Sequence, residues 1–314
     1  MSIQYIDPLS RGFVRMKNAL FNPFDLQKWL VVGFTAFLAG LTDFAGGGRT
    51  GWSRGGKVEP ETILHFPQTA WLWLLDHPIW AAIIAFGAFL AFVIWVLISW
   101  LSARGKFMFL DNVVHNRAQI KAPWKEYGAE ANSFFLFSFL LGLIVLAIIV
   151  AYLIYCFVSL QTLYGSSRNM MTLIWPAILL GLGFLAIFIA CGFIHILLRD
   201  FVVPIMYRDR ISALKAVGKL VSLFPSQFLY FVGYGLFMLC LSILIVIGVI
   251  VLGLATCCIG FIFLLIPYVN SVVLLPVSYS FRAFGVEFLE QFGPEFKIFP
   301  KPDVDPSDQQ PISV

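Results

Sequence analysis

Six long apolar runs decide what this chain can fold into. An α-helix rises 1.5 Å per residue, so about 20 apolar residues are needed to cross the roughly 30 Å hydrocarbon core of a bilayer. Barrel strands need only about 9–11 residues and alternate apolar with polar positions, which these runs do not do. The sequence therefore predicts an all-α integral membrane protein with spans at residues 29–44, 79–101, 134–155, 175–198, 228–254 and 258–280.

Composition supports this class. Apolar residues make up 60% of the 314 residues and charged residues only 12%, whereas soluble domains are about half apolar and a quarter charged. We expect one six-helix membrane domain over residues 1–299 and a flexible cytoplasmic tail over 300–314, which is rich in Pro, Asp and Gln. Because 28 residues precede the first run, we expect it to be retained rather than cleaved as a signal peptide.

The basic residues predict the orientation. Of the 21 Lys and Arg residues, 17 fall on one side of the six expected spans, together with both termini. Cytoplasmic loops carry such an excess, so we expect both termini in the cytoplasm. The net charge of +4 then lies beside anionic lipid headgroups and needs no nucleic acid partner.

The two basic cytoplasmic connections resemble one another. Lys121 and Lys125 correspond to Lys215 and Lys219 at a constant offset of 94 residues, which suggests an internal repeat of helix, surface helix and helix. Each connection carries an apolar stripe at helical spacing, typical of an amphipathic helix lying in the membrane interface, and residues 281–292 have the same mixed character. We expect contact with anionic lipids or a membrane-protein partner through Lys121, Lys125, Arg210, Lys215 and Lys219.

Polar groups at membrane depth give a second candidate site. Pro267 and Pro276 each remove a backbone hydrogen bond from the sixth run, and Asn270 lies between them. A broken helix at mid-membrane can mark a solute or ion site, although proline kinks are also ordinary in membrane helices. His195 and Arg199 share a helix face one turn apart near the cytoplasmic boundary, which is typical of a headgroup-level anchor.

Catalysis and metal binding have weak support. The stretch GWSRG around Ser53 matches a hydrolase nucleophile elbow, and Asp76 and His77 follow it, but the elbow needs a strand before it and a helix after it. We interpret it as a glycine-rich external loop. The four histidines have no i, i+4 spacing and the five cysteines form no CxxC motif, so we expect no metal, no cofactor and no catalytic residue.

A family resemblance agrees with these predictions. The segments PFDLQKWLVVGF, RGKFMFLDNVVHNRAQIKAPWKEY and FRAFGVEFLEQFGPEF resemble a group of uncharacterised bacterial polytopic membrane proteins. The segment DFVVPIMYRDRISALKAVGKL is similar to the membrane domain fused to some glycerophosphodiester phosphodiesterases, but no segment here resembles their soluble catalytic domain. The resemblance implies a bacterial inner-membrane protein and no catalytic residues. We therefore expect a non-enzymatic protein that binds lipid or a partner, with a small-solute transporter or channel as the alternative.

Overall fold

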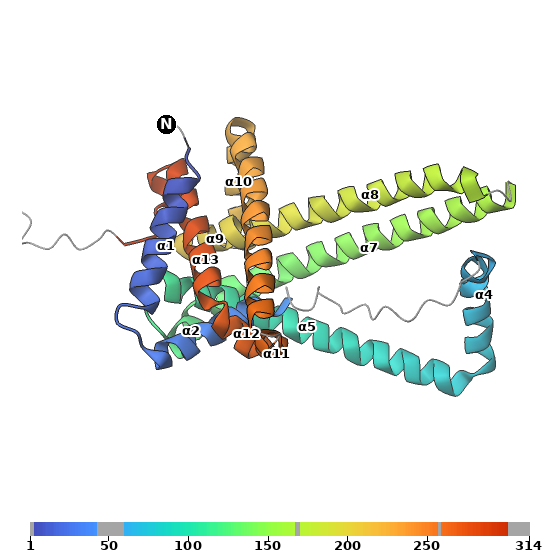
Figure 1. Ribbon diagram of the computed structural model, residues 1–314, viewed down its shortest axis with the longest axis horizontal. Helices are drawn as coiled ribbons and strands as arrows, with labels where there is room; N and C mark the ends of the chain where they lie inside the picture. The colour runs from blue at the N-terminus through green and yellow to red at the C-terminus, as the bar shows by residue number, and fades with distance from the viewer. Residues whose placement is uncertain (1–2, 43–59, 167–169, 257–258, 301–314) are drawn as a thin grey trace, which may run out of the picture.

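The computed structural model describes residues 3–42, 60–166, 170–256 and 259–300, and these residues are helical with no strand among them (Figure 1). The predicted all-α class is confirmed for this part of the chain. The expected GWSRG loop and the expected tail beyond residue 300 lie outside the described residues.

In the described part of the chain, four helical segments are long and apolar enough to cross a membrane: Pro78–Val114, Gly128–Leu163, Ile174–Asp209 and Ala213–Ala255. They contain helices α5 (Pro78–Val114), α7 (Gly128–Ser166), α8 (Met170–Leu197) and α10 (Ala213–Ala255). Of their most apolar windows, two bury none of their residues and the others bury 6% and 11%. Soluble proteins rarely expose apolar surface on this scale, so the helices require lipid around them.

The long helices project from one compact region. Helices α7 and α8 form an extended antiparallel hairpin, α5 points away on the same side, and α10 stands steeply across the direction of the hairpin (Figure 1). After α8 the chain continues through a π-turn, η1 (Leu198–Val202), into the short helix α9 (Val203–Asp209). The spans therefore meet where α5 ends and α9 begins.

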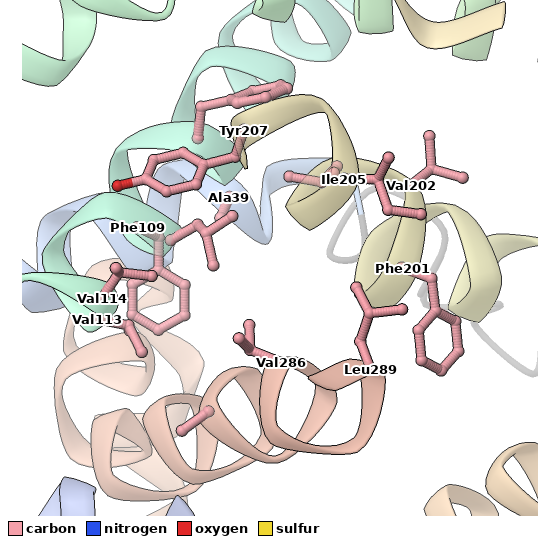
Figure 2. Close-up of a cluster of buried hydrophobic side chains, with 14 of the residues drawn as sticks. Ala39, Phe109, Val113, Val114, Phe201, Val202, Ile205, Tyr207, Val286 and Leu289 are labelled. Atoms are coloured by element: carbon pink, nitrogen blue, oxygen red, sulfur yellow. The ribbon is translucent and has the colours of Figure 1, made fainter. Parts of the chain in front are cut away.

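The compact region is built on helix α13 (Leu275–Leu289), which packs against the N-terminal helix α1 (Ile6–Leu20). Figure 2 shows Val286 and Leu289 of α13 facing Phe109 of α5 and Ile205 of α9. These four side chains are at most 4% exposed. Burying a side chain of this size stabilises the fold by about 1.5–3 kcal/mol, so the core lies here rather than between the projecting helices.

Six complete spans are not confirmed, and the first expected span differs most. Residues 29–39 of this run belong to helix α2 (Leu26–Ala39), whose 14 residues reach only about 21 Å, and residues 43–44 lie outside the described part of the chain. The helix begins at Asp25, whose carboxylate accepts from the backbone N–H groups of Gln27 and Lys28, and it ends at Gly40. It packs along the C-terminal end of α5, where Ser102 donates a 2.9 Å hydrogen bond to the Ala39 carbonyl.

The sixth expected span is broken into three helices, α11 (Ile259–Leu265), α12 (Pro267–Val273) and α13. Ile266 is extended immediately before Pro267, and a second break at Leu274 bends α12 and the α13 segment by 65°. Pro267 and Pro276 lie in the first turns of their helices. Backbone N–H groups in a first turn have no partner within the helix, so the N–H that each proline lacks costs the helix no hydrogen bond. If this bent pair counts as one span, the described residues contain at most five spans.

Two of the segments expected to be separate interfacial helices are parts of longer helices. Residues 213–224 do not form a separate surface helix, because α10 runs from Ala213 to Ala255 with Pro225 inside it. Residues 281–292 belong mostly to α13, whose Phe284 and Phe288 are fully buried. The other connection does form a short separate helix, α6 (Lys121–Glu126).

The turns that precede α6 and α10 share one backbone feature. Asn116 and Arg210 both have positive φ, at 50° and 55°, and they are separated by the same 94 residues as the lysine pairs. Two similar turns do not establish a duplicated unit, so the internal repeat stays a prediction.

Candidate functional site

The two basic connections lie side by side. Arg210 ends α9 in the left-handed conformation and donates to both the side-chain carboxylate and the backbone carbonyl of Glu126. The N–H of Ala213, at the start of α10, donates a 3.1 Å hydrogen bond to the hydroxyl of Ser133 on α7. We call the surface formed by α6 and the first three turns of α10 the basic face; it carries Lys121, Lys125, Lys215 and Lys219.

The five predicted contact residues are not equivalent. Arg210 is held by Glu126 and lies over the Tyr127 ring at 3.8 Å, and Lys219 bonds Asp209 at 2.7 Å. By contrast, three lysines are exposed and form no ion pair with any residue that the structure describes: Lys121, Lys125 and Lys215. Of the five predicted contact residues, these three carry a charge that no described residue neutralises.

Exposed apolar side chains accompany these lysines. Leu214 and Val221 of α10 are 72% and 50% exposed. They are seven residues apart and therefore share one helix face, while Lys215 follows Leu214 directly. The start of α10 thus combines an exposed apolar stripe with an adjacent free cation.

The amphipathic pattern predicts that the aromatic residues of the first connection face lipid, but in the structure they pack against the protein. Tyr127 is 5% exposed and stacks on Tyr207 with ring centroids 4.5 Å apart. Burial raises the pKa of the Tyr127 phenol above its ordinary value, against the opposing effect of Arg210. Trp124 is half-buried and makes an edge contact with Trp100. This stripe anchors α6 to the protein, which leaves its lysines facing outward.

A buried carboxylate fixes the turn that precedes α6. Asp111 of α5 is fully buried. Its carboxylate accepts hydrogen bonds from Nε and Nη2 of Arg117 at 2.8–3.0 Å, from the Tyr207 hydroxyl at 3.0 Å and from the His115 ring at 3.1 Å. Charge-assisted bidentate pairs of this kind hold both partners in fixed geometry. Asp111 is not among the site residues predicted from the sequence. The signal that could have indicated it is its position at the end of an apolar helix, six residues before an arginine.

A second carboxylate, Asp200, lies at the π-turn where α8 ends. Arg199 approaches it with two nitrogens at 2.8 and 3.0 Å, and the Tyr234 hydroxyl donates at 3.1 Å. Arg282 of α13 donates to the Arg199 carbonyl at 2.7 Å, and its guanidinium nitrogen lies 3.9 Å from Asp200. The anchor expected at Arg199 is thus part of a charge cluster around the buried Asp200, and this cluster includes Arg282, which is not among the residues predicted from the sequence.

The N-terminal basic residues are also paired internally. Arg15 of α1 bonds the buried Glu287 of α13 at 2.6 Å, and Arg11 bonds the same carboxylate at 3.1 Å. Both pairs join α1 to α13. Some of the predicted cytoplasmic positive charge therefore stabilises the compact region.

The candidate pathway residues lie at the two breaks. Pro267 starts α12, Asn270 lies in its middle, and Pro276 lies in the first turn of α13. The side-chain oxygen of Asn270 is buried and has no hydrogen-bond partner among the described residues. A buried acceptor without a partner costs about 1–3 kcal/mol, so this position is an energetic weak point of α12.

Residues considered for chemistry do not come together in the described part of the chain. His77, at the end of helix α4 (Pro60–Asp76), stacks on Trp73 at 4.6 Å and contacts its carbonyl. No group of three or more His, Cys, Asp or Glu residues that could hold a metal ion occurs among the residues described. Ser53 lies outside them.

The exposed apolar helices define the chain as a helical, multi-pass membrane protein. Residues 3–297 match a family of unknown function (DUF7544), and the chain belongs to this family. No curated protein and no solved structure matches the chain. The expectation of an uncharacterised family is thereby confirmed, whereas the similarity to phosphodiesterase-linked membrane domains is not shown.

Proposed function

We propose that this chain is a non-enzymatic membrane protein that binds anionic lipid headgroups through its basic face. One observation carries the proposal: Lys121, Lys125 and Lys215 are exposed and form no ion pair with a described residue, although Arg210 and Lys219 beside them are paired. These three lysines therefore do not stabilise the fold through ion pairs with described residues, and their charge is available to an external anion.

The surroundings of the lysines fit a lipid surface. Each lysine beside an anionic leaflet contributes about 1 kcal/mol of attraction. The adjacent Leu214 and Val221 can enter the acyl boundary while Lys215 stays at phosphate level, which is how basic amphipathic helices bind membranes. A water-facing hairpin would leave those two side chains in solvent.

The side of the membrane follows from the charge distribution. We place the basic face and both termini in the cytoplasm of a bacterium and the spans in its inner membrane, because 17 of the 21 basic residues fall on that side of the six spans that the sequence predicts. The anionic cytoplasmic leaflet then supplies the ligand.

Lys215→Gln is expected to lower the affinity for phosphatidylglycerol about fivefold, because it removes about 1 kcal/mol of headgroup attraction. Lys219→Gln is the matched control: it lies one turn further along the same helix, but its charge is already neutralised by Asp209, so we expect less than a twofold change. Native mass spectrometry of the purified protein, titrated with phosphatidylglycerol or phosphatidylcholine, measures both. Equal effects of the two variants would exclude the basic face as the lipid site.

The alternative function is movement of a small solute through the broken sixth segment. The Asn270 oxygen, which is buried and has no hydrogen-bond partner in the described part of the chain, lies between two helix breaks and favours it, since broken helices form solute sites in many transporters. Measurable solute flux through reconstituted proteoliposomes would favour this alternative over lipid binding alone.

A further inference from the structure

A groove of about 310 Å³ lies between helix α7 and the start of α10. Its apolar wall is made by side chains of both helices, which are Leu136, Phe137, Leu140, Leu141 and Ile144 of α7 and Leu214 of α10. Leu136, Leu140 and Ile144 are each more than half exposed. Their i, i+4 spacing places them on one face of α7. The groove therefore opens on a surface of the spans that requires lipid.

One end of the groove lies beside a free cation. Two serines complete the wall, Ser133 and Ser212. The Ser133 hydroxyl accepts the 3.1 Å hydrogen bond from the backbone N–H of Ala213, which fixes the start of α10 at the end of the groove nearer to the start of α7. Lys215 follows Leu214 directly, is exposed and forms no ion pair with a residue that the structure describes. The groove thus joins an apolar wall to an unneutralised positive charge at one end.

The dimensions of the groove limit its occupant. From Ser133 to Ile144, α7 rises about 16 Å. Half of a hydrocarbon core of roughly 30 Å is about 15 Å, so the groove is as long as an acyl chain within one leaflet. An α-helix is about 10 Å across and would need several times the volume of the groove over this length. The groove therefore fits one acyl chain and does not fit a helix of a partner protein.

We propose that the groove holds one acyl chain of the anionic lipid whose headgroup contacts Lys215. This inference rests on the proposed function and adds a chain site to its headgroup site. Bulk lipid is as apolar as the groove, so burial alone does not favour the bound chain. The groove instead surrounds the chain on several sides, and the summed dispersion contacts favour it. The same lipid is then held at two points, its phosphate by Lys215 and one chain by the groove.

The test is photo-crosslinking of the purified full chain by phosphatidylglycerol with a diazirine in the middle of one acyl chain. Peptide mass spectrometry should find adducts concentrated on residues 136–144. Leu140→Trp fills the groove without altering any charge and should lower these adducts at least fivefold. Leu146→Trp is the matched control, because Leu146 is 52% exposed on the same helix and does not line the groove; it should change them less than twofold. Ile144→Trp serves if Leu140→Trp does not fold.

Lys215→Gln tests whether the chain and the headgroup belong to one lipid. It should lower the adducts on residues 136–144 at least threefold, and Lys219→Gln should change them less than twofold. The inference is overturned if Leu140→Trp and Leu146→Trp give equal adducts, or if Lys215→Gln leaves the adducts unchanged. The proposed function is decided separately, by the phosphatidylglycerol affinities of Lys215→Gln and Lys219→Gln. A fivefold loss of affinity in Lys215→Gln without groove adducts would refute the chain site and retain the headgroup site.

Discussion

Gly105→Ala is expected to destabilise the protein strongly, because α2 and α5 touch at this position without room for a side chain. A methyl group at Gly105 would lie 2.5 Å from the backbone N of Ala39 and from the backbone carbonyl carbon of Leu38. Neither backbone atom can move aside as a flexible side chain can. Forced overpacking of this kind costs about 1–3 kcal/mol, and the midpoint of thermal unfolding in detergent, followed by circular dichroism, should fall accordingly.

Gly87→Ala is the control on the same helix. A methyl group there meets no atom within 4 Å, and alanine favours helix over glycine by about 1 kcal/mol. Its unfolding midpoint should stay the same or rise. If the two variants unfold at the same temperature, α2 does not pack against α5 as described, and the short first segment would have to be placed elsewhere.

Asp111→Asn is expected to have the second large effect. The neutral amide cannot neutralise Arg117, and it offers one acceptor oxygen in place of the two that Arg117, Tyr207 and His115 share where α5 meets α9. Removing one partner of a buried ion pair costs about 3–5 kcal/mol, and the 33% exposure of the Arg117 side chain places the expected loss near the lower end. The same thermal unfolding assay measures it.

Glu126→Gln supplies the comparison, because it neutralises a carboxylate that is 48% exposed in its pair with Arg210. Exposed pairs contribute about 0–1 kcal/mol, so its unfolding midpoint should change little. A loss in Asp111→Asn no larger than that in Glu126→Gln would mean that Asp111 is hydrated and does not organise the turn before α6.

The long helices could be predicted from the sequence because their signal is local. Each of the runs 79–101, 134–155, 175–198 and 228–254 lies inside one described helical segment, and apolar length alone identifies it. In the first run, helix α2 ends at Gly40, and hydropathy does not show where a helix stops. The breaks at Pro267 and Pro276 were predicted, because proline acts on its own backbone.

The charge clusters could not be predicted in the same way. Tyr207 and Asp111 are 96 residues apart, and Arg282 reaches the carbonyl of Arg199 from 83 residues away. Such pairs depend on how helices pack, which one sequence does not reveal. For the same reason, the sequence pattern predicts a lipid-facing stripe at Tyr127, whereas in the structure the Tyr127 ring stacks on Tyr207.

The most direct test of the central claim is which side of the membrane the basic face occupies. Lys121→Cys and Lys215→Cys are made in a background lacking the five native cysteines and treated with an impermeant thiol reagent, in intact cells and in inverted membrane vesicles. The account predicts that both positions are labelled in the vesicles and neither in intact cells. Labelling of either position in intact cells would contradict it.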